Sequence, residues 1–148
     1  MHAPACLAIN TIIAESLDVI ATDHAPHATQ EKQQEFTEAP FGIVGLETAL
    51  SLTLALVDEG VLTLESAVDK LATAPAKAFS LNAGTLAVGA PADVAIVDPN
   101  REWQVDPSRF RSKSRNTPFA GWKVKGRVTT TIVSGRVVFE LDRSERQA

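Results

Sequence analysis

The sequence predicts a mixed α/β chain, in which one short strand and several helices precede a β-rich C-terminal part. Two observations predict this order. Apolar residues recur at helical spacing between residues 43 and 81, whereas β-branched residues gather in short runs between residues 92 and 140. The change of pattern falls at Gly84. We therefore expect two parts, residues 1–84 and residues 85–148.

The composition is that of an ordinary globular domain. The chain has 148 residues, 45% of them hydrophobic and 22% charged, which is enough for one domain with a core. A net charge of -4 gives no electrostatic reason to expect nucleic acid or an anionic membrane as a partner. The single cysteine, Cys6, cannot form an internal disulfide. The N-terminal stretch ACLAINTIIA is too short and too polar to span a bilayer. These features predict a cytoplasmic protein.

The first elements lie before residue 43. We expect a helix over residues 4–16, followed by a strand over residues 17–22. Residues 24–42 are polar and have no apolar period, which predicts a long loop with at most one helical turn around QEKQQEF. A loop of this length inside a compact domain is usually functional or disordered.

Three helices are expected next. Residues 43–59 are strongly apolar and predict the first helix, and Gly60 suits its C-cap. Thr63 can cap the second helix, where apolar residues recur at i, i+3, i+4 and i+7. The third helix is short, over residues 74–81, with Pro75 in its first turn.

The C-terminal part predicts strands. The stretch ADVAIVD, residues 92–98, reads as a short strand bounded by Pro91 and Pro99. The runs RVTTTIV and RVVFEL flank the dipeptide Ser134-Gly135 and predict a hairpin. The stretch SKSRNTPFAGW, which contains a proline and a glycine, should be loop.

The stretch DVIATDHAPH, residues 18–27, carries the candidate chemistry. An apolar run ends there in Asp23, His24 and His27. In a barrel of alternating strands and helices, side chains at the C-terminal ends of strands converge on one reactive face. A carboxylate placed there can ligate a metal and also handle a proton. A polar loop whose side chains cap a helix explains the same residues, and the D-H-x-x-H pattern alone leaves both readings open.

A resemblance over most of the chain favours the first reading. The stretches VIATDHAPH and EKQQEFTEAPFGIVGLETAL closely resemble the last barrel strand and the following loop of the dihydroorotases, which are members of the amidohydrolase superfamily. The similarity continues through GTLAVGAPADVAIVD, SKSRNTPFAGWKVKGRV and TIVSGRVVFE, in the same order. It implies the C-terminal part of a (β/α)8 amidohydrolase barrel, plus the C-terminal strands of a small β-sandwich domain.

The resemblance also implies roles for single residues. Asp23 corresponds to a metal ligand that is also the catalytic acid/base, which activates the attacking hydroxide and protonates the leaving amide nitrogen. His27 corresponds to a residue that holds the substrate carboxylate. The backbone of Phe41 and Gly42 corresponds to a contact with the substrate ring amide. His24 has no ligand role in the motif, so we expect it to be structural. Phe41 could instead fill the core, and Gly42 could serve only to turn the chain.

The chain departs from the dihydroorotase pattern in its metal ligands. Dihydroorotases carry an H-x-H pair on the first barrel strand, a bridging lysine or aspartate, and further histidines, none of which is present in this sequence. The N-P-P-L-R type stretch that supplies a substrate-binding asparagine is missing too, and His2 does not fill the gap. Zinc is expected in the complete family enzyme, and we expect this chain alone to hold none tightly. The resemblance thus implies a piece of a longer protein or a truncated gene product.

Three functions follow from these observations. The first is a dihydroorotase, which interconverts dihydroorotate and carbamoyl aspartate in pyrimidine biosynthesis and is inactive as this chain alone. The second is a non-catalytic module that forms homo-oligomers or binds a partner such as aspartate carbamoyltransferase. The third is another cyclic amidohydrolase, such as a hydantoinase or allantoinase. The second histidine of DHAPH, His27, disfavours the third, because those relatives generally carry other residues there.

Overall fold

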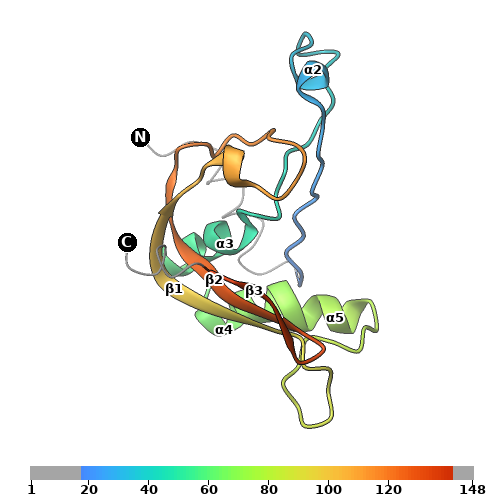
Figure 1. The fold of residues 1–148 in the computed structure, drawn as a ribbon, viewed down its shortest axis with the longest axis vertical. Helices are drawn as coiled ribbons and strands as arrows, with labels where there is room; N and C mark the ends of the chain where they lie inside the picture. The colour runs from blue at the N-terminus through green and yellow to red at the C-terminus, as the bar shows by residue number, and fades with distance from the viewer. Residues whose placement is uncertain (1–17, 142–148) are drawn as a thin grey trace.

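In the computed structural model, which describes residues 18–141, a series of short helices lies beside a three-stranded sheet (Figure 1). The predicted helix over residues 4–16 lies outside the described residues, and so do His2 and Cys6. The helical elements are α2 (Thr29–Lys32), α3 (Ala49–Asp58), α4 (Leu64–Val68), the π-helical turn η1 (Asp69–Thr73), α5 (Ala74–Ala78) and the 3-10 turn η2 (Pro107–Arg109). The strands are β1 (Val94–Gln104), β2 (Lys123–Val133) and β3 (Arg136–Glu140).

The sheet has the order β1-β2-β3, and both pairs are antiparallel. The predicted hairpin is confirmed, with β2 and β3 joined by Ser134 and Gly135. Their φ angles are 50° and 75°. Two successive positive φ angles are what a type I′ turn requires, and this turn matches the natural twist of the strands that it joins.

The prediction that Pro99 ends the first strand is wrong, because β1 continues to Gln104. Its register against β2 shifts between Asp98 and Glu102, so that Pro99 lies in a bulge. Proline has no N–H to donate to a partner strand, and a bulge is one of the few places in a sheet that accept it. The bulge therefore lets one long strand cross a residue that would otherwise end it.

Helix α3 packs directly on β2 at Gly126. This glycine is buried and has a φ of +87°, and a Cβ atom there would stand 2.2 Å from Leu54 Cδ1 of the helix. The Ser51 hydroxyl donates a 2.7 Å hydrogen bond to the Gly126 carbonyl, and the Trp103 indole N–H donates to the same oxygen at 3.0 Å. Because Gly126 has no side chain, α3 and β2 can approach each other closely.

The helix predicted over residues 43–59 begins six residues late, at Ala49. Backbone groups of Ile43 and Val44 bond to other segments instead, and the first carbonyl that accepts from the residue four positions later is that of Gly45, from the Ala49 N–H at 2.9 Å. The Ile43 carbonyl accepts from the Ala25 N–H at 2.9 Å, and the Val44 N–H donates to the Asn116 carbonyl at 3.0 Å. The predicted end is confirmed, since Gly60 follows the helix with a φ of +73°.

The second and third predicted helices form one continuous helical stretch. Thr63 caps it as predicted, because its side chain accepts a hydrogen bond from the Ser66 N–H at 3.1 Å. The stretch widens into η1, where the Ala74 N–H donates to the Asp69 carbonyl five residues earlier. Pro75 follows directly, in the first turn of α5 as predicted. Proline cannot donate to the residue four positions before it, and a π-helical turn accommodates that missing bond.

No strand forms in the described part of the segment predicted to be a strand over residues 17–22. One hydrogen bond ties it to the helices, from the Ile20 N–H to the Lys70 carbonyl at 3.0 Å. A single parallel bridge, between His24 and Ile43, follows it. A strand is stable only when neighbouring strands pair with it, and within residues 18–141 the isolated bridge forms at His24, after this segment has ended.

Two small cores hold the structure together. Leu56, Leu62 and Ala67 form the first, and Val44, Val105 and Phe110 form the second. Many large apolar side chains outside them are exposed, among them Phe36, Phe41, Leu46, Leu64, Val68, Phe79, Leu81, Leu86, Val88, Val137 and Val138. Within residues 18–141, no helix has the length and apolar character needed to cross a membrane. The division of the chain near residue 84 stays a prediction.

Candidate functional site

Three segments that are distant in sequence converge at the candidate site: residues 22–27, 42–45 and 112–116. The first two meet at the His24–Ile43 bridge and at Gly45, where a Cβ atom would stand 3.0 Å from the Thr22 side chain. The third is joined to them by the hydrogen bond from Val44 to the Asn116 carbonyl. Val44 is 1% exposed and belongs to the second core, so that the site rests on packed structure.

Asp23 is exposed and stands just before the bridge between the first two segments. Its φ angle is 44°, a left-handed conformation that is uncommon for residues other than glycine. Aspartate is among the few residues that adopt it readily. Backbone outliers of this kind cluster at functional sites, where the surrounding structure holds them in place. The predicted catalytic residue is therefore exposed and has an uncommon backbone conformation.

The His24 side chain bonds to the backbone of the neighbouring segment. Its Nδ1 atom accepts a 3.1 Å hydrogen bond from the Gly45 N–H, which ties the first segment to the second. Accepting through Nδ1 places the proton of the neutral ring on Nε2. The side chain thus supports the position of Asp23.

His27 uses both ring nitrogens within its own loop. Its Nε2 atom lies 2.8 Å from the Phe41 carbonyl oxygen. Because a carbonyl can only accept, Nε2 carries the proton. Its Nδ1 atom lies 3.6 Å from Glu31 Oε2, and the same oxygen accepts a 2.9 Å hydrogen bond from the Ala28 N–H. The Glu31 carboxylate therefore occupies the Nδ1 side of the His27 ring.

Phe41 and Gly42 close the loop that begins at His27. The Phe41 side chain is 91% exposed, which contradicts the alternative that it fills the core. Gly42 has a φ of +102°, and a Cβ atom there would stand 2.4 Å from Ala25 Cβ. The Lys32 ammonium donates to the Pro40 and Gly42 carbonyls, at 2.7 and 3.2 Å. Within residues 18–141, no hydrogen bond involves the amide N–H groups of Phe41 and Gly42.

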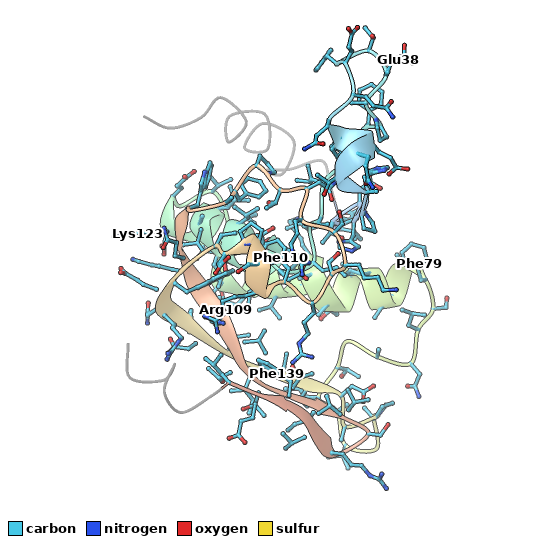
Figure 2. All side chains as sticks on the ribbon, turned by 45° about the horizontal axis from the view of Figure 1, so that its top comes forward. Glu38, Phe79, Arg109, Phe110, Lys123 and Phe139 are labelled. Atoms are coloured by element: carbon cyan, nitrogen blue, oxygen red, sulfur yellow. The ribbon has the colours of Figure 1, made fainter. Side chains whose placement is uncertain are left out.

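The loop between these ends projects from the body of the molecule. Figure 2 shows Glu38 at its outer end, pointing away from the rest of the chain. The expected single helical turn is present as α2. The tip bonds to itself, through the N–H groups of Glu38 and Ala39 and the Glu35 carbonyl. The loop is therefore fixed at its base, and among residues 18–141 its tip is hydrogen-bonded only to itself.

Asn116 is the site residue that sequence reasoning missed. Its Nδ2 atom donates to the Ala25 and Gly42 carbonyls, at 3.0 and 3.2 Å. Its Oδ1 atom accepts from the His27 N–H at 3.4 Å and faces the Ser114 hydroxyl. The Ser114 hydroxyl also contacts the His27 carbonyl oxygen. The stretch SKSRNTPFAGW, which indicates only a loop, gives no local signal of contacts with residues about ninety positions away.

The described residues do not form a metal site. No group of three or more His, Cys, Asp or Glu side chains that could hold a metal ion occurs within residues 18–141. Catalytic zinc sites normally take three protein ligands. Asp23 is the predicted ligand, and the neighbouring histidines are engaged with Gly45, Phe41 and Glu31. A metal at Asp23 would need ligands from outside the described residues.

A cleft away from the candidate site lies between α3, the sheet and the loop after β1. This cleft has a volume of about 520 Å³, and none of the predicted site residues lines it. The Arg127 guanidinium stacks 5.1 Å from the Trp103 ring, and Arg111 stacks 5.8 Å from the Phe139 ring. Burial and the like charges of Arg109 and Arg101 lower the pKa of Arg127. Figure 2 labels Arg109, Phe110 and Phe139, which line this cleft.

Comparison with known proteins gives one consistent result. Residues 3–138 match the amidohydrolase family. The chain is 57% identical over 126 residues to a dihydroorotase of Syntrophotalea carbinolica, which covers 85% of this chain and 30% of that protein. It is 56% identical over 131 residues to a dihydroorotase of Anaeromyxobacter dehalogenans, covering 88% of this chain and 30% of that protein. The chain thus spans about 30% of the length of the curated relatives that it matches.

Solved structures show the same fold. The L-hydantoinase (dihydropyrimidinase) from Arthrobacter aurescens superposes with a TM-score of 0.82 at 35% identity, over 90% of this chain and 31% of that one. A D-hydantoinase (dihydropyrimidinase) from a Thermus species superposes with a TM-score of 0.76 at 28% identity, again over 90% and 31%. These similarities confirm the predicted fold class, α/β, as the last part of an amidohydrolase barrel with strands of its small β-sandwich domain.

Proposed function

The chain belongs to the amidohydrolase family, and from that premise we propose that it supplies part of the active site of a dihydroorotase. This activity is the reversible hydrolysis of dihydroorotate to N-carbamoyl-L-aspartate, a step of pyrimidine biosynthesis. The proposal is supported by identities of 52–57% to curated dihydroorotases, against 25–35% to the solved hydantoinases. In this proposal, the cyclic amide of dihydroorotate is the reacting group, and the protein recognises the substrate by its carboxylate.

One observation carries the proposal: the segment with Asp23 and His27 lies directly against the segment with Gly42. The Ala25 N–H donates to the Ile43 carbonyl at 2.9 Å, and His27 Nε2 reaches the Phe41 carbonyl at 2.8 Å. The exposed carboxylate of Asp23, the His27 imidazole and the Phe41-Gly42 backbone therefore lie on two neighbouring segments of the chain. General acid/base chemistry on a small anion needs such a set of groups.

Asp23 would act on protons. Its carboxylate would take a proton from the attacking water and return it to the amide nitrogen as the ring C–N bond breaks. The exposed side chain of Asp23 supports this role, because exposure leaves the carboxylate accessible to a water or a substrate. Zinc is expected in the complete family enzyme, with Asp23 as one ligand. Residues 18–141 do not supply the others, and we expect this chain alone to hold no metal tightly.

His27 and the Phe41-Gly42 backbone would hold the substrate. A ring N–H of histidine can donate to a carboxylate, and the Glu31 carboxylate already stands beside His27 Nδ1 at 3.6 Å. We propose that the substrate carboxylate replaces Glu31. The backbone N–H groups of Phe41 and Gly42, which bond to nothing in the described residues, would face the ring amide.

A second function is favoured by the exposed apolar side chains. They include Phe41, Leu46 and Val138, and large exposed apolar areas mark association surfaces. The alternative is therefore a non-catalytic module that forms homo-oligomers or binds a partner such as aspartate carbamoyltransferase.

A chimaeric enzyme tests the first function. This chain would replace the matching 30% of the Syntrophotalea carbinolica dihydroorotase, to which it is 57% identical. We expect the chimaera to interconvert carbamoyl aspartate and dihydroorotate, and the chain alone not to do so above background.

Asp23→Asn should abolish turnover and leave metal partly bound, whereas Glu38→Gln at the loop tip should change nothing. His27→Ala should raise KM more than it lowers kcat. Substantial turnover by the Asp23→Asn chimaera would remove Asp23 from the acid/base role.

A further inference from the structure

The side chain of Asn116 connects the two ends of the projecting loop. Its amide reaches the carbonyl of Ala25, before the loop, and the carbonyl of Gly42, after it. The same side chain accepts from the His27 N–H at 3.4 Å. No other described side chain is hydrogen-bonded to both the 22–27 and the 42–45 segments from outside them.

The chemistry of these contacts requires an asparagine. The Ala25 and Gly42 carbonyls are both acceptors, so the group between them must offer two N–H donors. The His27 N–H is a donor, so the other end of that group must accept. A primary amide meets both conditions, and the contacts also fix its orientation, since only Nδ2 can face the two carbonyls. A carboxylate of the same shape would place an acceptor against acceptors.

We infer that Asn116 is a positioning residue, which sets the distance between His27 and the Phe41-Gly42 backbone. This inference rests on the proposed function and deepens it, because those groups are the ones proposed to hold the substrate. Asn116 acts through them and touches no reacting atom. The backbone carbonyl of Asn116 also accepts from the Val44 N–H at 3.0 Å, which ties Asn116 to a residue of the second core. The second core thereby fixes the distance between His27 and the Phe41-Gly42 backbone.

The position of the His27 ring depends on this connection. The ring reaches the Phe41 carbonyl at 2.8 Å, and that carbonyl belongs to the residue just before Gly42. The Ser114 hydroxyl supports the other end, where it contacts Asn116 Oδ1 and the His27 carbonyl. If the amide no longer holds Gly42, the Phe41 carbonyl moves, and the proton of the His27 ring loses the acceptor that keeps it on Nε2.

The test uses the full 148-residue chain and needs no turnover. Asn116→Asp keeps the shape of the side chain and removes the two donors, and Asn82→Asp makes the same change at an exposed residue as a matched control. Amide hydrogen exchange reports the hydrogen bonds of residues 24–28 and 42–45, and the ring ¹⁵N signals of His27 report its tautomer. Neither measurement depends on dihydroorotase activity, so a failure of the proposed function leaves this test intact.

We expect Asn116→Asp to speed exchange at Ala25, His27 and Val44 at least tenfold, with the β2–β3 hairpin unchanged. The His27 signals should shift from a single Nε2–H tautomer to a mixture, and Asn82→Asp should match the parent chain. Unchanged exchange at the three amides would overturn the inference. So would an equal increase in the hairpin, because that indicates general destabilisation. If Asn116→Asp does not fold, Ser114→Ala replaces it in the test. A smaller increase in the exchange rate, confined to the same three amides, would then support the inference. An unchanged exchange rate at these amides would refute it.

Discussion

Replacing Gly42 by alanine tests whether the two main segments of the candidate site depend on their close approach. The new Cβ atom would stand 2.4 Å from the Ala25 methyl group, about 1 Å less than the distance at which ordinary contacts begin. The backbone fixes the position of Cβ, so no side-chain rotation can relieve this contact and the backbone itself has to move. The φ angle of +102° adds strain, because it is a conformation that L side chains rarely adopt.

The expected loss of unfolding free energy is the sum of the backbone strain and of the hydrogen bonds that the clash breaks. A non-glycine residue in such a backbone region costs about 1–3 kcal/mol. A shift of about 1 Å would take the 3.2 Å bond from Asn116 to the Gly42 carbonyl and the 2.9 Å bond from Ala25 to the Ile43 carbonyl out of range. Each lost bond costs about 0.5–1.5 kcal/mol. The total loss of unfolding free energy is therefore about 2–6 kcal/mol.

Gly60→Ala is the matched control. Gly60 has a φ of +73° and nothing within 4 Å of a Cβ atom, so alanine there meets the backbone strain alone. Denaturant unfolding at one fixed protein concentration should give a free energy loss that is about 1–3 kcal/mol larger for Gly42→Ala than for Gly60→Ala. Equal losses for the two variants would refute the reasoning, because the clash and the lost bonds at Gly42 would then contribute nothing.

Two further predictions concern the chain alone. Dialysis against a mild chelator should leave far less than one zinc per chain by elemental analysis, since the described residues offer no group of three ligands; one tightly held zinc would show that residues such as His2, His24 or His27 complete a site. The chain should also self-associate at micromolar concentration, most simply as a symmetric dimer, because exposed side chains such as Leu46 and Val138 gain about 1.5–3 kcal/mol each when fully buried. Sedimentation velocity measures this, and a stable, cooperatively folding monomer would contradict it.

Local signals in the sequence predict local structure well. The Ser134-Gly135 turn, the Thr63 cap and the Gly60 helix end are all present, because each is decided by residues within a few positions of one another. The single helical turn in the long loop is also present, capped by the Glu31 carboxylate. These features follow from turn and cap chemistry that needs no partner from elsewhere in the chain.

Long-range contacts explain the errors. Residues 43–45 are apolar enough for a helix, but their backbone groups bond to Ala25, Asn116 and His24. Pro99 reads as a strand end, yet the strand passes it in a bulge opposite Gly126. The segment before Asp23 reads as a strand and forms none in the described residues, because strand formation depends on neighbours. Asn116 is missed for the same reason, since its hydrogen bonds to Ala25, His27 and Gly42 join residues more than seventy positions apart.

The self-bonded tip of the projecting loop has a consequence for how the sequence can change. Lys32 and Asn116 hold the base of the loop at the Pro40, Gly42 and Ala25 carbonyls, whereas residues 33–38 are all exposed. Exposed tips between fixed ends are the positions where proteins accept inserted segments. Added residues at the tip would lengthen the loop and leave Asp23, His27 and Gly42 where they are. The chain thus carries, next to its candidate site, a place where evolution or design can attach a new recognition element.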